Sequence, residues 1–222
     1  MDSQNKVCGV ILAAGRSSRM GTDKALLPWP PGALSGCFSL DPTLLSAAIA
    51  ALKTHTAAVI VVAGRNAAAL APVVSACGAM LAVNPDPDRG QFSSLQTGLR
   101  QAVNQGCDAA MIMPVDCPPL PEAILKRLRA EFERAIAAGN WAIAPENNGR
   151  HGHPLIAGRT LIDVFLTAPV SSNAREVKRA HAEKIEYLAI AEPGIGLDLN
   201  TPEEYRAASS LVPAGDRHGN AA

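Results

Sequence analysis

The sequence has few aromatic residues, no net charge and no long hydrophobic run. Aromatic residues make up 4% of the chain and hydrophobic residues 48%, so an aliphatic core is expected. Twenty basic residues balance twenty acidic ones, so no overall field attracts nucleic acid or a membrane surface. No stretch approaches the about 18 apolar residues of a transmembrane helix, and the N-terminus MDSQNK is short and polar. We therefore expect neither secretion nor membrane insertion, and an anion-binding site would have to be local.

The sequence also lacks a C-x-x-C pair. Its five cysteines are scattered and have mostly apolar neighbours. An odd number in this setting indicates reduced, buried thiols and not a disulfide framework or a zinc site. This usage is typical of a cytoplasmic protein.

Apolar segments typical of β-strands alternate with longer segments of helical periodicity. Strands are predicted at 7–13, 57–63, 79–83, 109–115 and 141–144, and helices near 43–53, 67–76, 93–104 and 121–137. After residue 145 the pattern predicts a loop at 146–153, helices near 159–166 and 173–182, strands at 185–189 and 196–199, and a final helix after Thr201. The alternation predicts a single three-layer α/β/α Rossmann-like domain with a mostly parallel sheet, spanning 1–211, with 212–222 as a disordered tail.

The first candidate site is the segment 7–27, VCGVILAAGRSSRMGTDKALL. An apolar strand ends there in a loop with two glycines and three cations. Gly15 would let the backbone N–H groups approach an anion, and Arg19 and Lys24 would add charge where a triphosphate concentrates its own. The segment matches neither the G-x-x-x-x-G-K-[ST] loop nor the G-x-G-x-x-G fingerprint. On residue types alone, a loop without function is an equally good interpretation.

The second candidate is Asp116, which ends the apolar run AAMIMPVD before CPPLP stops the strand. Ligands of open α/β sheets bind outside the carboxyl ends of strands, so Asp116 should lie beside the first loop. A carboxylate facing a triphosphate is a typical magnesium ligand. The alternative is an aspartate that only caps the helix beginning near Pro121.

Asp198 and Asn200 are a third candidate, because side chains two apart on a strand point to the same face. Both could then address one site. Alternatively, Asn200 only turns the chain into the last helix.

Gly90, Ser93 and Ser94 form a fourth candidate in the segment GQFSSL. A glycine and two serines before a helix offer hydroxyls and helix-start N–H groups to a ligand. A simple serine helix cap is the alternative.

A fifth candidate is the run RHGHP, residues 150–154. A His-x-His pair can bind a transition metal, but neither a cysteine nor a third histidine lies nearby in the sequence, which disfavours that interpretation.

The string LAAGRSSRMGTDKALL resembles the signature of nucleotidyltransferases that transfer NMP from an NTP. The five segments occur in that family's order between residues 7 and 206. Ala14, where guanylyl-transferring relatives usually have a second glycine, together with GQFSSLQTGL and Gly-His-Pro, resembles the molybdenum cofactor cytidylyltransferases. Segment 30–42 departs from the family's short connection, and Asn200 stands where cytidylyl relatives often have aspartate.

The resemblance implies magnesium-dependent transfer of CMP from CTP to the terminal phosphate of molybdopterin or molybdenum cofactor, with release of pyrophosphate. It implies catalytic roles for Arg19, Lys24 and Asp116, a magnesium site at Asp116 with Asp198 or Asn200, and an acceptor-side role for His153. The nucleotide-binding residues that it implies are Leu12, Ala13, Ala14, Gly15, Lys24, Gly90, Ser93 and Ser94. A molybdoenzyme maturation protein is a further expected partner. The alternatives are transfer to another acceptor, such as a sugar phosphate, and a nucleotide- and cofactor-binding maturation factor that does not turn over.

Overall fold

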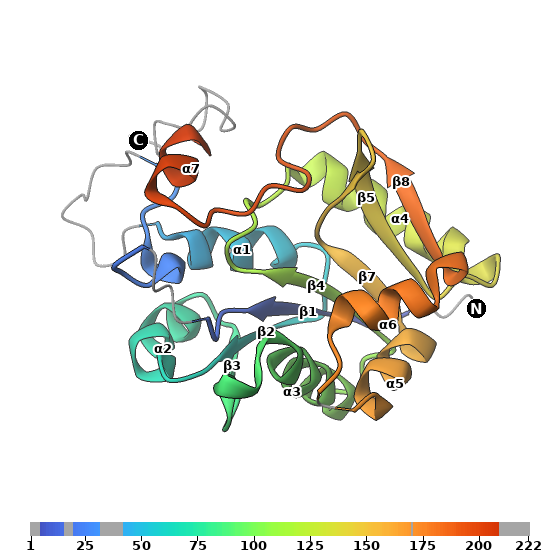
Figure 1. Cartoon of the computed structure of the whole chain (residues 1–222), viewed down its shortest axis with the longest axis horizontal. Helices are drawn as coiled ribbons and strands as arrows, with labels where there is room; N and C mark the ends of the chain where they lie inside the picture. The colour runs from blue at the N-terminus through green and yellow to red at the C-terminus, as the bar shows by residue number, and fades with distance from the viewer. Residues whose placement is uncertain (1–4, 16–19, 32–41, 170, 209–222) are drawn as a thin grey trace.

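The computed structural model describes residues 5–15, 20–31, 42–169 and 171–208 (Figure 1). Eight strands form one sheet: β1 (Val7–Leu12), β2 (Ala58–Ala63), β3 (Met80–Val83), β4 (Ala109–Pro114), β5 (Ala142–Asn147), β6 (Arg150–His151), β7 (Leu155–Gly158) and β8 (Ile185–Ala189). The α-helices are α1 (Leu44–Lys53), α2 (Ala67–Ala76), α3 (Gln91–Asn104), α4 (Glu122–Ala137), α5 (Arg159–Thr167), α6 (Ala174–Ala180) and α7 (Pro202–Ala207). Short 3₁₀ turns are η1 (Lys24–Leu26), η2 (Pro87–Arg89) and η3 (Ala182–Lys184). No helix in these ranges is both long and apolar enough to cross a membrane.

The sheet is mixed and mostly parallel. Its strand order is β3-β2-β1-β4-β7-β5-β6, and β8 pairs with β5. Strands β3, β2, β1 and β4 run parallel to one another, β7 is antiparallel to both β4 and β5, and β8 is parallel to β5. Helices cover both faces, so the predicted three-layer α/β fold is confirmed.

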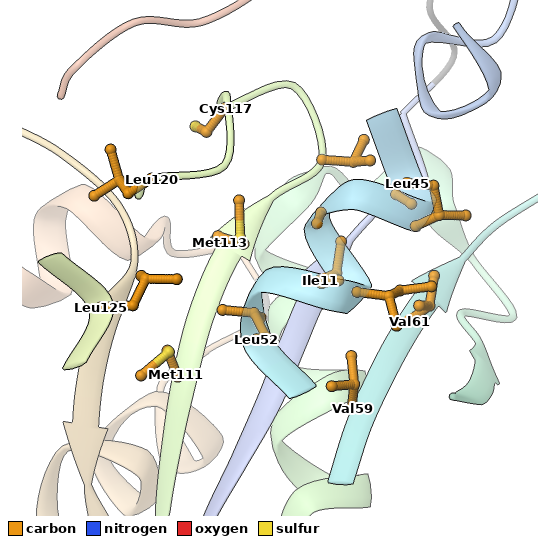
Figure 2. Packing of buried hydrophobic residues seen from close by; sticks show 14 of the residues in the cluster. Ile11, Leu45, Leu52, Val59, Val61, Met111, Met113, Cys117, Leu120 and Leu125 are labelled. Carbon is orange, nitrogen blue, oxygen red and sulfur yellow. The ribbon is translucent and has the colours of Figure 1, made fainter. Parts of the chain in front are cut away.

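Two hydrophobic layers hold the helices on the sheet, because the central strands are buried on both faces. Ile11 of β1 and Met111 of β4 pack with α1, α2 and α4 on one face, as Figure 2 shows for α1. Val10 and Ile112 face the opposite layer, which α3 and α5 supply. In Figure 1, α1 and α3 accordingly lie on opposite sides of β1. This period-two alternation with both faces apolar is typical of central parallel strands.

The strand ends that matter for function are those of β1 and β4. These two strands pair in parallel with Leu12 opposite Pro114, and the Val115 amide donates to the Leu12 carbonyl at 3.0 Å. The residues that follow the two strands therefore leave the same edge of the sheet side by side.

After residue 145, two secondary-structure predictions were wrong and one strand was missed. The expected loop at 146–153 includes the end of β5 and all of β6, and β7 was not predicted, because four uniformly buried residues show no alternation. Segment 196–199 forms no strand; Leu199 donates a single backbone bond to the Asp116 carbonyl at 2.8 Å. Residues 212–222 lie outside the described ranges, so the predicted tail remains a prediction.

The expectation of reduced cysteines was wrong for two of the five. Cys8 on β1 and Cys107 just before β4 form a disulfide between residues 99 positions apart in sequence. The sequence could not indicate it, because only the pairing of β1 with β4 brings the two residues together. Cys77 and Cys117 carry free thiols, and Cys37 lies outside the described residues.

Gly98 sets how closely α3 approaches the sheet. A Cβ atom at this position would lie 2.5 Å from Val10 Cγ1 and 2.8 Å from Val62 Cγ2. We expect Gly98→Ala to lower the free energy of unfolding by about 1–3 kcal/mol through overpacking, although alanine alone favours a helix by about 1 kcal/mol.

Urea denaturation measures this change. Gly194→Ala is the matched control, because a Cβ there makes only ordinary contacts at 3.6 Å or more. Unchanged stability of the Gly98→Ala variant would show that α3 can move away from the sheet at no cost.

Candidate active site

A cavity of about 990 Å³ opens at the carboxyl ends of β1 and β4; we call it the large cavity. Its volume lies at the upper end of the range of about 300–1,000 Å³ that is usual for ligand pockets. The residues that line it are Leu12, Ala13, Ala14, Gly15, Asp23, Lys24, Arg65, Asn66, Pro87, Asp88, Gly90, Gln91, Ser94, Pro114, Val115, Asp116 and Asn200. They come from strand ends, loops and the start of α3, which is where open α/β sheets bind ligands.

Lys24 is the central cation of the large cavity. Its residue is only 9% exposed, and its ammonium donates to Asp116 Oδ2 at 3.1 Å and to Asn200 Oδ1 at 2.9 Å. The turn η1 presents this side chain, and the Asp23 carboxylate caps the turn by accepting from the Ala25 amide at 3.0 Å. Two oxygens from distant parts of the chain thus converge on one positive charge.

Asn66 joins three segments around this cation. Its side-chain N–H groups donate to the Ala13 carbonyl at 2.9 Å and to Asp23 Oδ2 at 2.6 Å. Its carbonyl oxygen accepts from the Gly64 amide at 3.0 Å. One amide therefore ties the end of β1, the residue after β2 and the cap of the Lys24 turn together.

The start of α3 faces the large cavity with Gly90, Gln91 and Ser94. Asn84 orients the serines, since its amide donates to Ser93 Oγ at 2.8 Å and to Ser94 Oγ at 3.0 Å. The Ser93 hydroxyl donates to the Gly90 carbonyl at 2.8 Å. In the described part of the chain the Ser94 hydroxyl has an N–H donor but no acceptor, so its proton is available to a ligand.

Gly15 lines the large cavity without being required by the backbone. Its φ angle lies outside the left-handed region, and an added Cβ would meet no atom of the described residues within 4 Å. The role expected of Gly15, to let backbone N–H groups approach an anion, stays a prediction. Because glycine has no side chain, this position leaves open space in the cavity.

A second cavity, of about 320 Å³, adjoins the large one. The two share Leu12, Gly90, Gln91 and Pro114 as lining residues. The apolar part of the second cavity's wall includes Phe92, Leu95, Ile112, Leu155 and Phe165, and its ionisable side chains are Arg89, His153, Arg175 and Lys178. Polar groups at an apolar wall suit an aromatic or heterocyclic ligand that carries negative charge.

The second cavity shifts the pKa values of two of these side chains. Burial, then the charge of Arg175, lowers the pKa of Lys178. Burial and the charge of Lys178 lower the pKa of His153 to about 4, against the opposing effect of Asp116. His153 is therefore a neutral imidazole at neutral pH.

Beside Asp116, the buried Cys117 thiol contacts two further polar side chains. Its sulfur lies 3.3 Å from Asp198 Oδ1 and 3.6 Å from His153 Nδ1. Burial, followed by the charges of Asp198 and Asp116, raises the pKa of Cys117 well above its usual value. We call Asp116, Cys117, His153 and Asp198 the thiol cluster.

The structure brings most of the sequence-predicted residues together. Leu12, Ala13, Ala14, Gly15, Lys24, Gly90, Ser94, Asp116 and Asn200 all line the large cavity, whereas Ser93 and Asp198 do not. His153 lines the second cavity, and Arg19 lies outside the described residues. Asn66, Asn84, Arg175, Lys178 and Cys117 were not predicted. The contacts of Asn66 and Cys117 join segments far apart in sequence.

We expect Asn66→Ala to loosen the Lys24 turn. Losing bonds to partly buried groups should lower the free energy of unfolding by about 1–3 kcal/mol, and the capped Ala25 amide should exchange its hydrogen faster. Urea denaturation and hydrogen exchange measure the two effects. Asn140→Ala is the control, since Asn140 donates a single side-chain bond, to Glu186; equal effects in the two variants would contradict a joining role for Asn66.

Comparison with known proteins agrees with this geometry. A molybdenum cofactor guanylyltransferase from Xanthomonas euvesicatoria is 34% identical over 142 residues, which cover 62% of this chain and 61% of that protein. The molybdenum cofactor cytidylyltransferase of Escherichia coli is 25% identical over 88% of this chain and 92% of its own length. Most of the similar curated proteins are named guanylyltransferases.

Among solved structures, Rv0371c from Mycobacterium tuberculosis superposes with a TM-score of 0.75 at 24% identity, over 93% of this chain and all of that one. A structure of Rv0371c described as a complex with manganese gives a TM-score of 0.66 at 22% identity, with coverage of 93% and 100%. These likenesses support the fold. The family model for the MobA-like NTP transferase domain matches residues 9–185, so the chain belongs to this family and is a nucleotidyltransferase.

Proposed function

We propose that this protein transfers CMP from CTP to the terminal phosphate of a molybdopterin-type acceptor. The observation that carries the proposal is the pair of adjoining cavities with a common wall of Leu12, Gly90, Gln91 and Pro114. A transfer between two bound substrates needs both to reach one reacting phosphorus atom. Two sites that share a wall meet this requirement, and holding both substrates in place lowers the entropic part of the barrier.

The large cavity is the proposed nucleotide site. Ala13, Ala14 and Gly15 line it after the end of β1, and Gly90, Gln91 and Ser94 line it at the start of α3. Helix-start N–H groups favour phosphate, and the Ser94 hydroxyl can donate to the nucleotide. Ser93, whose hydroxyl binds the Gly90 carbonyl, would act by shaping this helix start.

The residues around Lys24 fit a magnesium ion. Asp116 and Asn200 already direct one oxygen each at a single cation, the Lys24 ammonium, at 3.1 and 2.9 Å. A carboxylate and an amide oxygen are hard ligands of the kind that magnesium takes together with phosphate oxygens. Asp116 and Asn200 would hold the ion, which supplies charge neutralisation at the phosphates; Asp198 faces Cys117 instead.

Lys24 would then move from the carboxylate to the triphosphate. Its ammonium and the guanidinium of Arg19 are the proposed partners of the β- and γ-phosphates and of the departing pyrophosphate. A cation that binds charge appearing as the bond breaks lowers the barrier more than it tightens ground-state binding.

The second cavity is the proposed acceptor site. Its apolar wall of Phe92, Leu95 and Phe165 suits a ring system, and Arg175 and Lys178 offer positive charge to the acceptor's phosphate. The second pKa of such a phosphate is about 6, so the phosphate is largely dianionic at neutral pH. It can attack the α-phosphate without a general base, so positioning and charge neutralisation suffice for catalysis. The neutral His153 would border the acceptor.

We expect Asp116→Ala to lower turnover by at least about a thousandfold, because the Asp198 carboxylate beside it contacts the Cys117 thiol and not Lys24. Asn200→Ala should cost less, since water can substitute for a neutral ligand. The measurement is pyrophosphate release from CTP with magnesium and molybdopterin.

Asp108→Ala is the control for this experiment, because Asp108 is an exposed aspartate at the opposite end of β4. Retention of more than about a tenth of the wild-type rate by Asp116→Ala, a barrier change under about 1.4 kcal/mol, would contradict the assignment. A wild-type protein that binds CTP and acceptor without releasing pyrophosphate would instead be a carrier, and release with a sugar phosphate alone would change the acceptor.

The choice of CTP over GTP rests on Ala14, which lines the large cavity. Guanylyl-transferring relatives usually have glycine here, and the extra methyl group should crowd a purine. We expect CTP to raise the melting temperature more than GTP, because the tighter ligand stabilises the folded state more. Ala14→Gly should reduce the difference. An equal or larger shift with GTP in the wild type would reverse the choice of base, in agreement with the names of most relatives, and would leave the reaction class unchanged.

A further inference from the structure

The thiol cluster contains donors that magnesium does not use. Magnesium prefers oxygen, whereas a thiolate and an imidazole select zinc and similar transition metals. The proposed magnesium-dependent transfer of CMP requires neither Cys117 nor the imidazole of His153 as a metal ligand. These two side chains nevertheless face each other and Asp198 beside the catalytic carboxylate.

We propose that Cys117, His153 and Asp198, together with Asp116, form a binding site for zinc or a similar divalent transition metal. One donor atom from each of Asp116, Cys117 and Asp198 lies within 4.8 Å of the others. His153 lies outside this group of three, but its Nδ1 is 3.6 Å from the sulfur, which makes it the candidate fourth donor.

The separations around the sulfur fit such a metal. Zinc binds sulfur at about 2.3 Å and nitrogen or oxygen at about 2.0–2.2 Å, so neighbouring donors of a tetrahedral site lie about 3.5 Å apart. The sulfur lies 3.3 Å from Asp198 Oδ1 and 3.6 Å from His153 Nδ1. Each distance therefore suits two neighbouring donors on one ion, and the imidazole would have to turn toward the carboxylates as the ion binds.

The fold holds the donors from three separate segments. Asp116 and Cys117 follow β4 directly, and Figure 2 shows Cys117 on the loop beyond this strand. The bond from the Leu199 amide to the Asp116 carbonyl fixes the segment with Asp198, and Gly152 allows the His153 loop to approach closely, because a Cβ there would lie 2.7 Å from Ile195 Cγ2. Asp198 is exposed, so an ion can enter from solvent.

Charge also favours a cation at this point. The buried thiol lies 3.3 Å from Asp198 Oδ1, and a donor oxygen of Asp116 lies within 4.8 Å of both. A bound metal ion would offset the charge of these two carboxylates. When the metal–sulfur bond forms, the thiol proton leaves to solvent and the sulfur electron pair binds the ion; no oxidant or reductant is needed.

The test is direct metal binding by the full-length protein, purified without chelators and titrated with cobalt as a spectroscopic probe. We expect one cobalt ion per chain and a thiolate-to-cobalt charge-transfer band that zinc abolishes by displacement and excess magnesium does not. Cys117→Ser should remove the band and lower zinc affinity at least about tenfold. His153→Gln and Asp198→Asn should weaken zinc binding with a weaker or shifted band.

Cys77→Ser and Cys37→Ser are controls for the loss of a thiol elsewhere in the chain; Cys77 is the other free thiol of the described residues, and Cys37 lies outside them. His151→Gln is the control for the loss of a nearby histidine. All three should bind zinc like the wild type, and melting curves confirm that each variant is folded. A wild type without the band, a band that survives in Cys117→Ser, or displacement by magnesium as readily as by zinc would overturn the proposal. None of these measurements uses turnover, so they are independent of the proposed transfer reaction.

Discussion

The arrangement of the site depends on the parallel pairing of β1 with β4. With Leu12 opposite Pro114, both strands end at the same level, and the phosphate-binding segment and Asp116 leave the sheet together. A register shift would turn the alternating side chains of either strand to the opposite face and break both hydrophobic layers at once. The packing of Ile11 and Met111 on one face and of Val10 and Ile112 on the other therefore also fixes the geometry of the active site.

The sequence predicts features that are encoded locally. The apolar run before Gly15 and the abrupt end of a strand at Asp116 identified two neighbouring strand ends, because strand length and strand-ending residues are short-range properties. The spacing of Asp198 and Asn200 predicted that both address one site, and the family resemblance implied that one or the other binds magnesium. The structure separates them, with Asn200 at Lys24 and Asp198 at Cys117, because the segment before α7 forms no strand and its side chains need not alternate.

Other features depend on contacts that no local pattern encodes. In the sequence, Asn66 is an ordinary residue before a helix. Only the fold brings Ala13, after β1, and Asp23, the cap of the Lys24 turn, to its amide. The His-x-His segment was set aside as a metal site because no cysteine lies near it in sequence. Cys117 is 36 positions away from His153, and only the order β4-β7-β5 brings its sulfur to the imidazole.

The contact of Lys24 with Asp116 and Asn200 has a consequence for the sequence of binding events. A free magnesium ion must displace the ammonium from these two oxygens, and moving a partly buried charge away from them is costly. A metal ion that arrives already bound to a triphosphate brings phosphate oxygens that accept the same ammonium. The protein should therefore bind the magnesium–nucleotide complex as one unit, and free magnesium should bind weakly between Asp116 and Asn200 until nucleotide is present.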